Sequence, residues 1–358
     1  MTVKSFDVRN VNHALPEMLW WLKAAGIQEG SRNGPVLVAP GPVIVSYRYP
    51  WERVLFSKDR DANPFFHFME ALWMLDGRRD VAWIQQFNSR MGGFSDDKTS
   101  LWGAYGYRWR SFFVHDQIQA VITHLRAWPD SRRAVLTMWS PNGDLWTMRS
   151  DWREELDGQG GPRSRDVPCN THAYLAIHDG HLDLTVCNRS NDAIWGAFGA
   201  NAVHMSFLHE YVARHLSLTI GTYHQFSNNM HLYPECYGKD IAERMAVEVD
   251  DRYSTGIAAA HPLILANQET MEDWDRDLRQ FIDMADPTRD PTVDRRFGFY
   301  TDFFAYTAAP MLRSWQERKR DETDGLEQAT HIQAPDWRLA CAEWIIRRED
   351  ARRDAEAA

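Results

Sequence analysis

The stretch "DVPCNTHAYLAIHDGHLDLTVCNRS" (residues 166–190) decides how the rest of the chain is interpreted. Residues 173–190 alternate apolar and polar side chains on both sides of Asp179-Gly180, a pattern that predicts a β-hairpin. Cys169 precedes the first strand and Arg189 follows the second. Because a hairpin brings its two ends together, we expect the guanidinium of Arg189 to be within reach of the thiol of Cys169.

Cys169 has two interpretations. A lone cysteine is most often a small buried hydrophobic residue, and nothing in its immediate neighbours excludes this. A nucleophilic cysteine needs its thiolate, and an ordinary thiol pKa of about 8.5 leaves little thiolate at neutral pH. A nearby cation such as Arg189 would favour that form, so the residues around Cys169 have to be considered together.

Composition limits the classes of function. The 358 residues are 44% hydrophobic and 25% charged, as in an ordinary soluble globular protein. A net charge of −10 argues against a general nucleic-acid binder. None of the four cysteines forms a C-x-x-C pair, so no metal site is expected. Neither a signal peptide nor a membrane span is recognisable, and we expect a cytoplasmic protein with reduced thiols.

Periodicity and turn signals predict strands and helices in mixed order, which is typical of the α+β class. Strands are expected in 34–50 (as a pair, or a strand and turn) and 132–139, and helices in 63–75, 115–128 and 202–215. We expect a catalytic domain over residues 1–240 with a surface insertion at about 149–166. Residues 241–358 are expected to form a mainly helical extension packed on the same domain.

Several charged residues stand where solvent exposure is the simplest explanation. Arg132 and Arg133 lie between a predicted helix and strand, and Arg32 precedes a predicted turn. These arginines could be surface charge, or they could join Arg189 in a clamp for one phosphate group. Glu70 lies in the middle of an apolar helix. It either faces solvent or serves as a proton relay, because burying an unpaired carboxylate is costly.

The segment "NNMHLY" (residues 228–233) places Asn229, His231 and Tyr233 at alternate positions. On a strand these side chains share a face and could bind a sugar.

Taken in order, these segments resemble the thymidylate synthase family. The resemblance covers roughly residues 30–235 and includes the 20-residue step from Cys169 to Arg189. It is carried by "SRNG", "FMEALWMLDG", "AYGYRWR", "DSRR", "PC", "RSNDAIWG", the single Asn201 and "HLY". The resemblance implies a thymidylate synthase-like α+β fold, in which a mixed twisted sheet packs against its copy in a homodimer. Helices 63–75 and 202–215 would cover the sheet's other side.

The resemblance also implies roles for individual residues. Cys169 would add to C6 of a pyrimidine nucleoside monophosphate, and C5 would then attack the one-carbon unit of 5,10-methylenetetrahydrofolate. Glu70 and Tyr105 would relay protons, and Asn201 would recognise the pyrimidine edge. The remaining assignments are Arg189, Ser190 and Arg32 to the phosphate, Arg132 and Arg133 to the phosphate site of the partner subunit, His231 and Tyr233 to the ribose, and Asp192, Gly196 and Trp73 to the folate.

The sequence departs from the synthases around the folate rather than around the phosphate. Asn170 replaces the usual histidine after the nucleophile, and "SNN" (227–229) replaces "GGD". A Trp-rich segment is missing near 86–96, one extra residue stands between Gly196 and Asn201, and the closing tail is not recognisable. A wetter site is expected, in which water rather than hydride completes the reaction and the product is hydroxymethylated.

Alternatives remain for the base, for the product of the last step and for catalysis itself. Asn201 favours dUMP, but the extra residue upstream leaves dCMP and CMP open. An ordinary thymidylate synthase with a rearranged tail differs only in the last step. A non-catalytic nucleotide-binding relative is a further alternative, against which the retention of Cys169 and Glu70 argues.

Overall fold

The computed structural model describes residues 2–31, 34–145, 166–235, 243–246, 249–264, 270–288 and 298–357. Arg32 lies outside these ranges, as does the expected insertion at about 149–166 apart from Asp166. Strands are β1 (Lys4–Val8), β2 (Ile27–Ser31), β3 (Gly34–Val38), β4 (Val43–Tyr47), β5 (Val135–Thr137), β6 (Asn170–His178), β7 (His181–Asn188), β8 (Asn191–Asp192), β9 (Thr219–Ser227) and β10 (Met230–Leu232).

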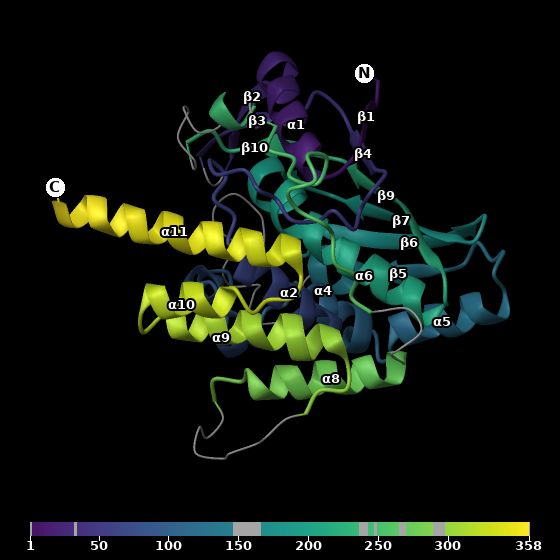
Figure 1. Cartoon of the computed structure of the whole chain (residues 1–358). Coiled ribbons are helices and arrows are strands. Elements are labelled where there is room, and N and C mark those ends of the chain that lie inside the picture. The colour runs from purple at the N-terminus through teal and green to yellow at the C-terminus, as the bar shows by residue number, and fades with distance from the viewer. Residues whose placement is uncertain are drawn as a thin grey trace.

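Helices occur between these strands and after them (Figure 1). They are α1 (Val11–Ala25), α2 (Pro64–Leu75), α3 (Val81–Ile84), α4 (Tyr105–Tyr107), α5 (Gln117–Ala127), α6 (Ala202–His215), α8 (Met271–Met284), α9 (Ala309–Arg318), α10 (Glu322–Ala329) and α11 (Pro335–Ala357). Shorter 3₁₀ and π-helical turns are Ser89–Gly93, Arg108–Phe112, Pro141–Leu145, Ala193–Asn201 and Phe303–Ala308. Among the described residues, no helix combines the length and apolar character needed to cross a bilayer.

The larger sheet has six strands in the order β1-β4-β9-β7-β6-β5. It is mixed, because β1 pairs with β4 and β7 with β9 in parallel while the other neighbours are antiparallel. The predicted hairpin is confirmed as β6 and β7. Its turn residues Asp179 and Gly180 have φ values of 48° and 78°, as a tight two-residue hairpin turn requires.

A second sheet, which the sequence patterns did not predict, has the order β2-β3-β10-β8. The expectation of a strand pair within residues 34–50 was wrong, because β3 and β4 belong to different sheets. β3 pairs with β2 and β10, whereas β4 pairs with β1 and β9. Alternation identifies a strand but does not specify its partner, and both strands here pair with distant segments.

The buried face of the larger sheet is covered by α6, which packs on β7 and β9. Helix α2 packs on α6, and α8, α9 and α11 pack in turn on α2 (Figure 1). All residues of α2 except Glu70 are buried, as expected for a helix with apolar residues on every side. The predicted helix 63–75 therefore lies between α6 and the C-terminal helices, with no side exposed to solvent.

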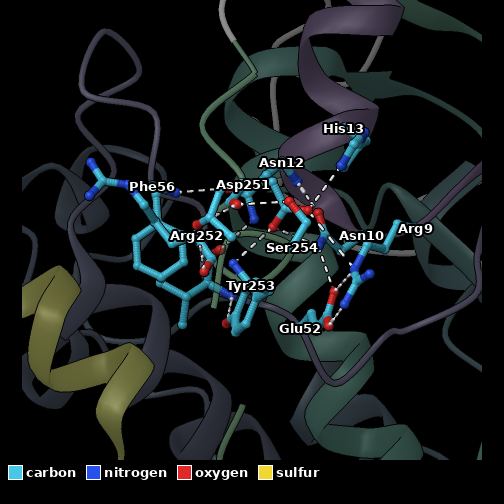
Figure 2. Close-up of polar contacts among 12 residues, drawn as sticks. Arg9, Asn10, Asn12, His13, Glu52, Phe56, Asp251, Arg252, Tyr253 and Ser254 are labelled. Carbon is cyan, nitrogen blue, oxygen red and sulfur yellow. Dashed lines mark hydrogen bonds and ion pairs between the residues drawn. The ribbon is translucent and has the colours of Figure 1, made fainter. Parts of the chain in front are cut away.

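A polar cluster fastens the segment after residue 249 to the N-terminal part of the chain (Figure 2). Asn10 donates a hydrogen bond to Asp251 at 3.1 Å, and Nε2 of His13 lies 2.9 Å from the same carboxylate. Glu52 accepts two hydrogen bonds from Arg9, at 2.8 and 2.9 Å. These contacts fix the chain where it leaves the sheets and turns toward α8.

The same connection continues to α11 through Tyr253. Its hydroxyl accepts a hydrogen bond from the backbone N–H of Val54 at 3.2 Å and lies 3.0 Å from Oδ2 of Asp336. Asp336 is 1% exposed, and burial raises the pKa of its carboxyl from 3.8 to about 7. Tyr253 and Asp336 thus link the start of α11 to the core through a titratable group.

We expect Asp336→Asn to change how stability depends on pH. The pKa of Asp336 is higher in the folded protein, so its contribution to stability is complete below about pH 4 and is lost as pH rises through 7. Asparagine mimics the neutral acid and removes this loss. Between pH 5 and 8, the variant should therefore gain about 2 kcal/mol in unfolding free energy relative to wild type, measured by urea denaturation. Asp324→Asn, at an exposed site, is the control and should follow wild type.

Candidate active site

A cavity of about 840 Å³ opens where α2, α4, the ends of β6, β7 and β10, and the start of α6 meet. Most of the predicted site residues line it, namely Glu70, Trp73, Tyr105, Cys169, Arg189, Ser190, Asp192, Gly196, Asn201, His231 and Tyr233. They come from segments separated by up to 163 positions in the sequence (233 − 70). The fold therefore brings together side chains from motifs whose only known relation was their order along the sequence.

Three predicted arginines are not in this group. Arg132 and Arg133 are exposed on the connection between α5 and β5, and neither lines the cavity. Arg32 lies outside the described residues. Among the described residues, the arginines that line the cavity are Arg90 and Arg189.

Arg189 is held beside Cys169 by the backbone. Its Nε and Nη2 atoms donate hydrogen bonds to the carbonyls of Pro168 (2.9 Å) and Val167 (3.0 Å), and its backbone N–H donates to the carbonyl of Cys169 (2.9 Å). Nη2 also lies 3.9 Å from Sγ of Cys169. A guanidinium beside a thiol favours the nucleophilic thiolate.

Glu70 faces the cavity rather than the protein surface. It is the one residue of α2 that is not buried, and its side chain is 13% exposed. The alternative of a solvent-facing polar side is therefore wrong, because α2 has no such side. Oε2 of Glu70 lies 3.1 Å from Nε2 of His204 on α6, but the two groups are not aligned as a hydrogen bond.

Tyr105 reaches the cavity because α4 approaches α2 very closely. A Cβ atom on Gly106 would lie 2.0 Å from the carbonyl oxygen of Met74, so only glycine allows this packing. Burial raises the pKa of the Tyr105 hydroxyl well above its usual range, and the charge of Cys169 raises it further. Tyr105 is consequently a neutral hydrogen-bond donor next to the thiol.

Asn201 ends the π-helical segment Ala193–Asn201. Each hydrogen bond of a π-helix spans one residue more than that of an α-helix. The π-helical segment can therefore accommodate the extra residue before Asn201 while Asn201 still lines the cavity. Nδ2 of Asn201 donates to Oδ1 of Asn191 at 3.2 Å, and Nδ2 of Asn191 donates to Oγ of Ser227 at 3.1 Å. All three side chains are buried, and this chain of hydrogen bonds couples the orientation of the Asn201 amide to that of Asn191.

Aromatic side chains also line the cavity. Trp73, Phe94 and Trp195 line it together with Asp192, whose Oδ1 accepts a hydrogen bond from the backbone N–H of Trp195 at 2.6 Å. Burial raises the pKa of the Asp192 carboxyl, although this N–H and the charges of His231 and Arg60 oppose the shift. Gly196 is needed here because its Cβ would lie 2.9 Å from Oδ1 of Asn191.

His231 and Tyr233 complete the wall formed by β10. Their rings are in edge-to-face contact with centroids 5.1 Å apart. Nδ1 of His231 lies 3.0 Å from Oδ1 of Asn229, which orients the imidazole. His231 and Tyr233 line the cavity, whereas Asn229 precedes β10 and contacts the imidazole without lining the cavity itself.

Sequence reasoning missed five polar residues of the wall, namely Arg90, Asp144, Asp166, Asn191 and His204. Burial raises the pKa of Asp166 to about 6. His204 follows Asn201 by three positions, a spacing that puts two residues on one face of a helix, so that signal was available. Asn191 gave no such signal, because its function depends on Ser227 from another strand.

The chain is similar to known proteins over its whole length. A family model described as thymidylate synthase matches residues 60–254. A deoxyuridylate hydroxymethyltransferase of Pseudomonas phage M6 is 42% identical and aligns over 98% of this chain and 95% of its own. One of Bacillus phage SP01 is 36% identical over 59% of this chain and 56% of its own. A putative thymidylate synthase of Methanothermobacter marburgensis is 30% identical over 39% of this chain and 54% of its own. By the family model and the near-complete alignment to the first of these relatives, the chain belongs to the thymidylate synthase family.

Proposed function

We propose that this protein is a transferase that hydroxymethylates C5 of dUMP, using 5,10-methylenetetrahydrofolate as the one-carbon donor. The observation that carries the proposal is the convergence of Cys169, Arg189, Glu70 and Asn201 on one cavity. Two relatives whose names specify deoxyuridylate hydroxymethyl transfer support it. Within this proposal, residues 1–240 form the catalytic domain and residues 241–358 a helical extension packed on it.

The residues of the cavity supply what this chemistry needs. The Cys169 thiolate adds to C6 of the pyrimidine, which is a poor electrophile, and thereby turns C5 into a nucleophilic carbon. Tyr105, neutral and next to the thiol, donates a hydrogen bond, and Glu70 moves protons to and from the nucleotide. Arg189 and Ser190 bind the phosphate, and His231 with Tyr233 binds the ribose hydroxyl.

The aromatic residues of the cavity fit a reduced pterin. Trp73, Phe94 and Trp195 offer flat apolar surface, and the half-buried carboxyl of Asp192 offers an acceptor for ring N–H groups. Bound methylenetetrahydrofolate supplies the one-carbon unit that becomes attached to C5. Gly196 keeps the wall beside Asp192 free of a side chain.

The amide of Asn201, which is oriented by its hydrogen bond to Asn191, supports uracil as the base. Uracil presents a donor at N3 and an acceptor at C4, and cytosine presents the reverse. If the Asn201 amide alone turned over, two acceptors would face each other, Oδ1 of Asn201 and Oδ1 of Asn191, so the hydrogen bond to Asn191 favours one base pattern over the other. The relatives' names favour uracil as the accepted pattern.

Charge and exposure support a homodimer with shared sites. The cavity wall includes the carboxylates of Glu70, Asp166 and Asp192, whereas its described arginines are Arg90 and Arg189. A nucleotide phosphate would be poorly neutralised by this set alone, so further cations must come from elsewhere. The exposed Arg132 and Arg133 of a second copy meet this need.

The larger sheet offers a surface for that second copy. Residues pointing away from α6 on its strands are exposed or half-buried, and they form two cross-strand rows: Ser46, His224, Thr185, Tyr174 and Val135, then Ile44, Phe226, Cys187, His172 and Thr137. A partly apolar face of this breadth is typical of a subunit interface. Arg132 and Arg133 precede β5 at its edge.

The proposal is tested by identifying the product. The protein is incubated with methylenetetrahydrofolate and, separately, dUMP, dCMP, UMP and CMP, and the nucleotide product is weighed. We expect 5-hydroxymethyl-dUMP with release of tetrahydrofolate. Cys169→Ala should lower turnover by about 10⁴-fold or more while dUMP binding, measured by calorimetry, is retained. A methyl product with dihydrofolate would identify a thymidylate synthase, and retained turnover in the variant would exclude the covalent mechanism.

Asn191→Ala should relax the choice of base. Without its Oδ1 acceptor the amide of Asn201 is free to rotate, so the preference for dUMP over dCMP in kcat/KM should fall by about tenfold. Asn228→Ala removes an exposed asparagine between β9 and β10 and is the matched control. An unchanged preference in folded Asn191→Ala protein would show that the amide chain does not select the base.

The shared site predicts complementation between inactive variants. Cys169→Ala and the double variant Arg132→Ala/Arg133→Ala are each expected to be nearly inactive. In a mixed dimer, the site with an intact Cys169 receives intact arginines from its partner. Refolding the two variants together in equal amounts should restore about one quarter of wild-type activity. No recovery in dimers shown to be mixed would place the arginines outside the site.

A further inference from the structure

The cavity contains an imidazole that the proposed chemistry has not yet used. His204 lies in the first turn of α6 and is 3% exposed, and its Nε2 lies 3.1 Å from Oε2 of Glu70. Both side chains line the cavity together with Cys169. Neither of the two atoms has an aligned hydrogen-bond partner within the described part of the protein.

Two buried polar atoms in this arrangement point to a third group. Buried polar side chains are nearly always hydrogen-bonded, and exceptions call for an explanation. A carboxylate oxygen and an imidazole nitrogen that are close but not aligned can both bond to one small molecule in the cavity. Water is suited to this position, because it donates to the carboxylate while it exchanges a proton with the imidazole.

We propose that His204 and Glu70 together bind and deprotonate the water that supplies the hydroxyl group of the product. The inference deepens the proposed function and rests on it. The Nε2 atom of a neutral His204 offers a lone pair that can take the proton, while the carboxylate of Glu70 accepts a hydrogen bond from the water and orients it.

The step balances as follows. After tetrahydrofolate has left, the nucleotide is bonded to Cys169 at C6 and carries an exocyclic CH₂ doubly bonded to C5. The water oxygen forms a bond to this CH₂, its proton passes to His204, and the C5=CH₂ electron pair moves to form an enolate at C4. The enolate collapses to restore the C4 carbonyl and the C5=C6 bond, and the thiolate of Cys169 leaves. The proton on His204 returns to the thiolate, so the adduct and one water yield hydroxymethyl nucleotide and free thiol.

The test separates this step from those before it. Release of tritium from [5-³H]dUMP reports that the one-carbon unit has been attached and C5 has lost its proton. Water addition is reported by the mass of the product, and 2-mercaptoethanol captures any exocyclic CH₂ that water does not reach, giving a thioether. The ratio of thioether to hydroxymethyl nucleotide measures water addition directly.

We expect His204→Gln and His204→Asn to release tritium within about threefold of the wild-type rate in the presence of the thiol. Both variants should raise the ratio of thioether to hydroxymethyl product by about a hundredfold, since a general base contributes this much or more. His215→Asn is the matched control, because His215 is on the same helix, lies 3.5 Å from a carboxylate of Asp275 and does not line the cavity. Its ratio should match wild type.

Two results would overturn the inference. A wild-type product ratio in both folded variants would mean that another group activates the water. A parallel loss of tritium release and product would mean that His204 acts before the water step. Failure of the proposed function would look different, because wild-type protein would then release no tritium from dUMP or would release it and form a methylated product.

Discussion

The position of one carboxylate constrains the whole site. Glu70 belongs to a helix that is otherwise buried, packed by α6 on one side and by α8, α9 and α11 on others. An ionised carboxylate inside such packing would be costly unless a polar space remained open to it. The cavity beside α2 is that space. The C-terminal helices thus contribute to the site indirectly, because they cover α2 and leave the cavity as the opening available to Glu70.

The opposite wall is fixed by the backbone rather than by side-chain packing. The hairpin β6–β7 brings Arg189 back to Cys169, and carbonyls of residues 167 and 168 hold the guanidinium there. The π-helical turn before Asn201 performs a similar task, because it absorbs an inserted residue while the amide stays tied to Asn191. In both cases, local backbone geometry positions a polar side chain that lines the cavity.

The sequence predicted those parts of the fold that depend on local patterns. Alternation around Asp179-Gly180 identified the hairpin, and helical spacing identified α2, α5 and α6. It did not predict the second sheet, whose strands β8 and β10 have two and three residues and show no periodicity. His204 was missed for a related reason: in a helix buried on most of its surface, one more buried residue looks like core. Its role depends on Glu70, which approaches from a different helix.

The helical extension also bears on the choice between water and hydride. In the thymidylate synthases a compact tail closes over the folate, and closing a site expels water. In this chain, no described residue after Tyr233 lines the cavity, and α8, α9 and α11 pack on α2. The described residues of the extension therefore support the helix that carries Glu70 and do not line the space that Glu70 faces. A cavity that these residues do not line, and that contains a carboxylate beside an imidazole, is suited to the bound water that the proposed hydroxymethylation requires.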